Sequence, residues 1–93
     1  MATLKLKKAV TINDKEVKEI EYDLEELTGK DLQHATKELS KRGIVCSFNE
    51  FDQNYHAMVF SIAADLAFED MDRFCGKDYM SACNAVRDFF LEE

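Results

Sequence analysis

The sequence predicts an α+β fold, with an N-terminal antiparallel β-hairpin followed by three to four α-helices in a single small domain. Three observations predict it. Residues 16–23 alternate in polarity, as a strand with one buried face does. Thr28 and Asp31 then stand at the spacing of a capping box, which begins a helix. From Leu32 onward apolar residues recur at steps of three and four. The short joint between Tyr22 and Thr28 means that a hairpin leads directly into a helix.

The hairpin is expected over about residues 3–23, with its turn at residues 13–15. Asn13 and Asp14 suit a tight turn because both residue types tolerate positive φ. Two sets of side chains in the second strand are expected on opposite faces: Val17, Glu19 and Glu21 on one, Lys18, Ile20 and Tyr22 on the other. A lone hairpin is marginal in water. Its apolar side chains must therefore pack on helices or on another chain: Leu4, Leu6, Val10, Ile12, Val17, Ile20 and Tyr22.

The first helix is expected over about residues 29–42. Its buried stripe is narrow and consists of Leu32, Ala35 and Leu39. Lys41 and Arg42 complement the negative end of the helix dipole, and Gly43 can take the left-handed conformation that ends a helix. Residues 44–51 fit either a short strand or an irregular loop held by aromatic side chains.

Three further helices are expected over about residues 53–66, 68–75 and 77–91. The first is the central core helix, with heptad-like spacing of Tyr55, Met58, Val59, Ile62, Ala63 and Leu66. The second is short, acidic and closed by Gly76, and its shared apolar face is Phe68, Met71 and Phe74. The last carries a stripe of Tyr79, Cys83, Val86 and Phe90, with Met80 and Phe89 beside it.

Charge is distributed unevenly along the 93 residues, whose net charge is −7. Residues 1–43 carry nine basic and nine acidic residues, whereas residues 44–93 carry three and ten. An acidic surface repels phosphates, so we expect no nucleic-acid partner. No apolar run approaches the roughly 20 residues of a membrane span, and no signal-peptide pattern is seen, so we expect no membrane partner and a protein that stays in the cytoplasm. Cys46, Cys75 and Cys83 fit free thiols in that reducing compartment.

We expect no enzyme, because no nucleophile-elbow, P-loop or dinucleotide-binding pattern is present. His34 and His56 belong to no metal-binding spacing, and a metal site would need distant residues such as His56, Asp52 and Cys46. We therefore expect no catalytic residues, no cofactor and no bound metal. Gly-Lys-Asp occurs twice, at residues 29–31 and 76–78, and we attribute both copies to the preference for a carboxylate at a helix start.

The last helix ends with three large apolar residues, Phe89, Phe90 and Leu91, and one helix face cannot bury all three. They either dock on the domain's own core or contact another chain. The acidic Asp70, Asp72 and Asp88 either solvate helix surfaces or meet a basic partner. The candidate partner-contact residues are thus Phe89, Phe90, Leu91, Asp70, Asp72 and Asp88.

Taken together, these segments resemble the small tail assembly chaperones of long-tailed phages, the group that includes the Mu-like and P2-like E proteins. Members of that family resemble this chain in six segments. These are an N-terminal hairpin, a Leu-Thr/Arg-Gly-x-Asp-Leu helix start, an Ala-rich middle helix, a Glu-Asp-Leu/Met segment, an Asp-Tyr helix opening and a Phe-Leu ending. The matching segments here are residues 10–22, 27–32, 56–67, 69–71, 78–79 and 89–91. Family members often carry a proline near Ala9 and a glycine in the hairpin turn, and this chain has neither.

The resemblance implies a non-enzymatic phage tail assembly chaperone. Such a protein binds the long, helical, aggregation-prone tape measure protein and holds it soluble until tail-tube subunits polymerise around it. It implies the host cytoplasm as location and absence from the mature virion, with the tail-tube protein and a second copy of the chain as further candidate partners. The alternative from another class is a small acidic phage or prophage regulator or inhibitor that binds a basic protein surface.

Overall fold

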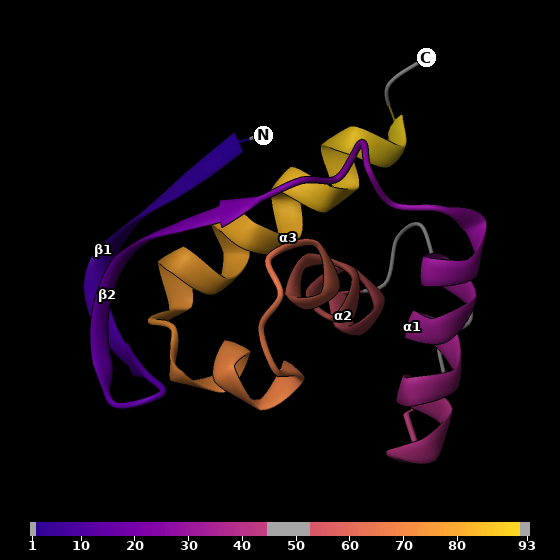
Figure 1. Cartoon of the computed structure of the whole chain (residues 1–93), viewed down its shortest axis with the longest axis horizontal. Helices are drawn as coiled ribbons and strands as arrows, with labels where there is room; N and C mark the ends of the chain where they lie inside the picture. The colour runs from indigo at the N-terminus through magenta and orange to yellow at the C-terminus, as the bar shows by residue number, and fades with distance from the viewer. Residues whose placement is uncertain (1, 45–52, 92–93) are drawn as a thin grey trace.

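The computed structural model describes residues 2–44 and 53–91, and it confirms the α+β class. The elements in chain order are β1 (Ala2–Ile12), β2 (Lys15–Tyr22), α1 (Gly29–Lys41), α2 (Gln53–Ala63), the 3-10 helix η2 (Phe68–Arg73) and α3 (Gly76–Leu91). The two strands form an antiparallel hairpin. Helix α2 lies in the middle, with α1 on one side of it and α3 and the hairpin on the other (Figure 1).

Helix α2 is enclosed on nearly all sides, because residues 55–61 are all buried. Helix α2 packs on α1, α3 and η2 at once, which confirms the expectation of a central core helix. The helix also ends at Ala63, three residues earlier than expected. Asp65 takes a left-handed conformation (φ 57°), and its N–H donates to the Ile62 carbonyl. The Leu66 N–H donates to the Ser61 carbonyl at 2.8 Å, which completes a Schellman ending.

The hairpin turn is made by Asn13 and Asp14, both at positive φ (53° and 64°), which is the type I′ geometry that favours a right-twisted hairpin. These two residues supply the conformations that a glycine would otherwise provide, and the next residue, Lys15, already belongs to β2. Val10, Ile12 and Ile20 are buried, as predicted for the apolar face.

The two strands of the hairpin do not pair regularly along their whole length. Lys5 pairs with Glu19 and Val10 pairs with Val17, so residues 6–9 all stand opposite a single residue, Lys18. A bulge of this kind bends the strand and changes which side chains face inward. In β2, Val17 and Ile20 are three residues apart and both pack against the core, so the strict two-residue period expected between them is wrong.

Helix α1 begins as predicted. The Asp31 N–H donates to Thr28 Oγ1 at 3.4 Å, and the Thr28 N–H donates to Asp31 Oδ2 at 2.9 Å, which confirms the capping box. The helix ends at Lys41, and Gly43 takes the left-handed conformation expected of it (φ 77°). The alternatives for residues 44–51 fall almost entirely outside the described residues.

The segment after α2 forms a 3-10 helix over Phe68–Arg73, not the α-helix expected over residues 68–75. Short 3-10 helices are frequent as connectors, and this one connects α2 to α3. Its predicted apolar face is present: Met71 and Phe74 are buried and Phe68 is half-buried. Arg42, at the end of α1, forms an ion pair with Glu69, and its guanidinium lies 5.1 Å from the Phe68 ring centroid. The two elements are thereby joined.

Asp78 connects the last helix to the first strand. Its side chain is 2% exposed and accepts the Lys7 N–H at 3.0 and 2.9 Å, the Lys8 N–H at 3.2 Å and the Cys75 thiol at 3.2 Å. Burial acts to raise the pKa of Asp78, but the Lys7, Lys8 and Cys75 hydrogen bonds outweigh it, so the pKa lies below its ordinary value. The two Gly-Lys-Asp copies therefore differ: Asp31 caps its own helix, whereas Asp78 binds backbone N–H groups within the irregular part of β1.

Candidate partner-contact site

The apolar residues at the end of α3 occupy different environments. The Phe90 ring stacks on Tyr55 with centroids 5.9 Å apart and lies 6.1 Å from the His56 ring. Phe89 and Phe90 are half-buried against the core, 6.0 Å apart. Leu91 is 57% exposed. Two of the three residues thus dock on the domain's own core, and one remains available to another chain.

A groove runs between the end of α3 and the chain that leaves β2, and we call it the C-terminal groove. Its apolar lining includes Tyr22, Leu24 and Phe89, and its carboxylates are Asp23, Glu25 and Asp88; Ala2 and Ala85 complete it. Two of the six predicted partner-contact residues, Asp88 and Phe89, line this groove.

Two of the three predicted acidic residues, Asp70 and Asp72, do not form one surface with that groove. Asp70 and Asp72 belong to η2, which lies at the opposite end of the molecule from the C-terminal end of α3 (Figure 1). Asp70 is half-buried and accepts the Ala67 N–H at 3.3 Å, so it caps its own short helix, whereas Asp72 is exposed. The partner-contact residues predicted from the sequence are therefore divided between two ends of the molecule (Figure 1).

A second groove contains none of the predicted partner-contact residues. It lies between strand β2 and the chain that ends α2, and we call it the strand groove. Its carboxylates are Glu19, Glu21, Asp23 and Asp65, and its half-exposed apolar side chains are Val17, Tyr22, Ala63, Ala64 and Leu66. The alternation of acidic and apolar residues in β2 is a feature of the sequence that could have indicated this groove. The contribution of Asp65 could not be predicted from the sequence, because it depends on where α2 ends.

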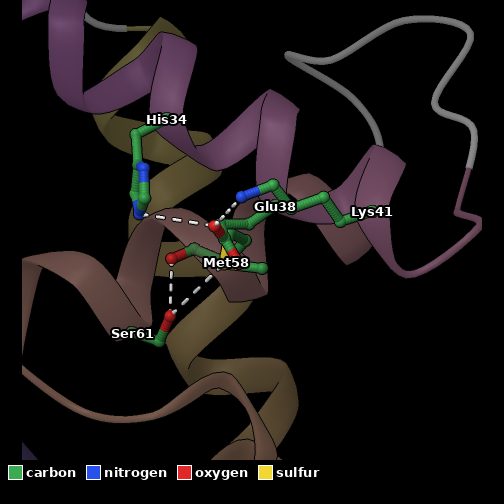
Figure 2. Close-up of polar contacts among 5 residues, drawn as sticks. All are labelled: His34, Glu38, Lys41, Met58 and Ser61. Atoms are coloured by element: carbon green, nitrogen blue, oxygen red, sulfur yellow. Dashed lines mark hydrogen bonds and ion pairs between the residues drawn. The ribbon is translucent and has the colours of Figure 1, made fainter.

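Two further sets of polar contacts lie on α1 and within α2. His34 Nε2 and Lys41 Nζ lie 4.0 and 3.4 Å from the same Glu38 oxygen, on the surface of α1 (Figure 2). With the His34 side chain 60% exposed, this is a weak surface arrangement. Ser61 Oγ donates to the Met58 carbonyl at 2.7 Å within α2, which uses its hydroxyl proton in the helix (Figure 2).

The cysteine and metal expectations can be examined for the same part of the chain. Burial raises the pKa of the Cys83 thiol to about 11, so it stays protonated at neutral pH. In residues 2–44 and 53–91, no group of three His, Cys, Asp or Glu side chains is placed to hold a metal ion. Two members of the distant set considered from the sequence, Asp52 and Cys46, lie outside these residues, so the absence of a metal stays a prediction.

Both grooves therefore offer the chemistry of a docking surface, with an apolar floor and a negatively charged rim.

Over the described residues, every buried side-chain nitrogen and oxygen has a hydrogen-bond partner. No helix of this part of the chain is long and apolar enough to span a bilayer. Comparisons with models of protein families, with curated proteins and with solved structures find no match to the chain.

Proposed function

We propose that the protein is a tail assembly chaperone of a long-tailed phage, which binds the tape measure protein and prevents its aggregation during tail-tube assembly. The observation that carries the proposal is the order and spacing of short motifs along nearly the whole chain, which resemble those of that family. Several motif residues have clear physical roles. Thr28 and Asp31 cap α1, Asp78 holds the hairpin to α3, and Phe90 packs on α2.

The surface chemistry supports such a role. A long helical protein waiting for its partners exposes apolar stripes that associate with one another. A small domain that covers part of such a stripe removes apolar surface from water, and its net charge of −7 opposes association of the complexes. The exposed Leu91 and the half-exposed apolar side chains of the two grooves supply the apolar contact.

The alternative function, a regulator that occupies a basic protein surface, has one specific observation in its favour. No lysine or arginine lines either groove. Together the two grooves are lined by six carboxylates, which are Glu19, Glu21, Asp23, Glu25, Asp65 and Asp88. The neighbouring genes discriminate the two functions. A tail-tube gene upstream and a very long coiled-coil-rich gene downstream would support the chaperone, and an isolated early gene would support the regulator.

Co-expression tests the proposal directly. The tape measure protein encoded beside this gene should be recovered largely in the pellet when expressed alone, and its soluble yield should rise several-fold when this protein is co-expressed. An unrelated acidic protein of similar size and net charge is the control. An equal rise with the control would show that the effect is nonspecific, and no rise with this protein would refute the chaperone assignment.

A further inference from the structure

The strand groove follows the side of β2 that β1 leaves free. Strand β1 pairs along one edge of β2, and no other described strand joins the sheet. Apart from Ile12, the groove is lined by β2, the adjoining Asp23 and residues 63–66. The Asp23 N–H donates to the Ala63 carbonyl at 3.2 Å, so the two walls meet at that end. An extended segment can add to a free strand edge through main-chain hydrogen bonds.

The floor of the groove selects an apolar occupant. Val17, Tyr22 and Leu66 are half-buried in the domain, so part of each side chain faces the groove. Beneath them Ile12 and Ile20 are 6% and 4% exposed and belong to the core. A row of half-exposed apolar side chains beside a strand receives alternate side chains of an added strand, which project toward the same face every second residue.

The rim selects a basic occupant. Glu19, Glu21 and Asp65 are exposed carboxylates on the rim, and Asp23 is half-buried. Two lysines of β2, Lys15 and Lys18, do not line the groove, although the N-terminal half of the chain has as many basic as acidic residues. Lys5 pairs with Glu19 across the hairpin, but no lysine or arginine lines the groove itself. A lysine or arginine brought by a partner would therefore add favourable charge contacts along the rim.

We infer that the strand groove binds an extended, basic segment of a partner protein. Its apolar side chains lie on the floor beside Val17 and Leu66, and its lysines or arginines lie at the rim beside Glu19 and Glu21. Residues 17–23 run beside the groove and span roughly 20 Å at the rise of a strand, which accommodates about seven residues of the partner. The identification of this partner as the tape measure protein rests on the proposed function. The extended, basic character of the bound segment is inferred from the groove alone.

The test uses the full chain and a capped peptide of about seven residues that alternates lysine with valine, matched to the length of the groove. Titration of ¹⁵N-labelled protein should shift the amide signals of residues 17–23 and 63–66. Glu19→Gln combined with Glu21→Gln removes two rim charges, keeps the side-chain shape, and should weaken binding about tenfold at low salt. The matched control, Glu26→Gln combined with Asp72→Asn, removes two exposed charges outside both grooves and should change binding less than about twofold.

Four results would overturn the inference. The first is no binding of the lysine–valine peptide by the wild-type protein. The second is an equal loss of binding in the rim pair and the control pair, which would show attraction by net charge alone. The third is a set of shifts confined to the C-terminal groove, at Ala85, Asp88 and Phe89. A peptide with glutamate in place of lysine should not bind, and binding of that peptide would contradict the role of the rim.

Failure of this inference is distinguishable from failure of the proposed function. Peptide binding in the strand groove by a protein that leaves tape measure solubility unchanged would refute the named partner and keep the groove. Protection of the tape measure protein by a chain that does not bind the peptide would refute the groove and keep the function.

Discussion

Replacing Asp78 by Asn should destabilise the fold more than any other substitution of a charged side chain in the described residues. The carboxylate is 2% exposed and receives backbone N–H groups from Lys7 and Lys8, which belong to the part of β1 that stands opposite Lys18 alone. These N–H groups are partly buried and have no strand partner in the regular pairing, so they need another acceptor. Asp78 supplies that acceptor, so it holds the hairpin on α3.

The expected magnitude follows from the bonds that change. A hydrogen bond to a charged group contributes about 1.5–3 kcal/mol to stability. The amide introduced by Asp78→Asn would keep one oxygen for one N–H group and place its NH₂ toward the other, so the loss should be about 2–4 kcal/mol. A domain of this size has a total stability of about 5–15 kcal/mol, and the variant should therefore remain folded and measurable.

Urea denaturation of the wild type and of Asp78→Asn at several pH values is the assay. Because the pKa of Asp78 is lower in the folded protein, its contribution is fully present above the ordinary value of 3.8 and is lost as the pH falls through the folded-state pKa. The difference in the free energy of unfolding between the two proteins should thus be constant near neutral pH and shrink below about pH 4.

The second Gly-Lys-Asp copy provides the matched control. Asp31→Asn changes the same residue type at the same position of a helix start, but Asp31 only closes a surface capping box, so the loss should be about 0.5–1 kcal/mol. A loss below about 0.5 kcal/mol for Asp78→Asn, or equal losses for the two variants, would refute the role assigned to Asp78.

The other predictions concern packing and backbone conformation, and urea denaturation measures each. Phe60→Ala should cost about 3–5 kcal/mol because Phe60 is 0% exposed, and Ile62→Ala only about 1–2 because Ile62 is half-buried; equal losses would show that the register of α2 is wrong. Phe90→Ala should cost about 2–3 kcal/mol and Leu91→Ala less than about 0.5, and the reverse order would place Leu91 in the core. Asp65→Gly should stabilise by about 0.5–1 kcal/mol because φ is 57° there, and a loss would show that the Asp65 side chain makes a stabilising contact.

Local signals in the sequence were sufficient for the fold class and for most element boundaries. The capping box of Thr28 and Asp31, the ending at Gly43 and the turn at Asn13 and Asp14 all depend on residues within a few positions of each other. Such features are decided by short-range hydrogen bonds and φ preferences, which the sequence displays directly.

The features that the sequence did not reveal depend on contacts between distant segments. The irregular stretch at residues 6–9 of β1 donates N–H groups to Asp78, which lies about 70 positions later in the chain. No local sequence pattern predicts this long-range contact. The enclosure of α2 reflects three neighbours at once. The strand groove joins β2 to Asp65, whose position was set by an early helix end. The predicted contact residues were divided between two ends of the molecule for the same reason.

The most direct measurement of the central proposal is light scattering by the tape measure protein when it is diluted from urea into buffer. With an equimolar amount of this protein present, scattering should be suppressed, and the suppression should approach its full extent near a fixed stoichiometric ratio. The rim variant with Glu19→Gln and Glu21→Gln should suppress it less than the wild type. Unchanged scattering at a several-fold excess of the wild-type protein would contradict the proposal that this chain is a tape measure chaperone.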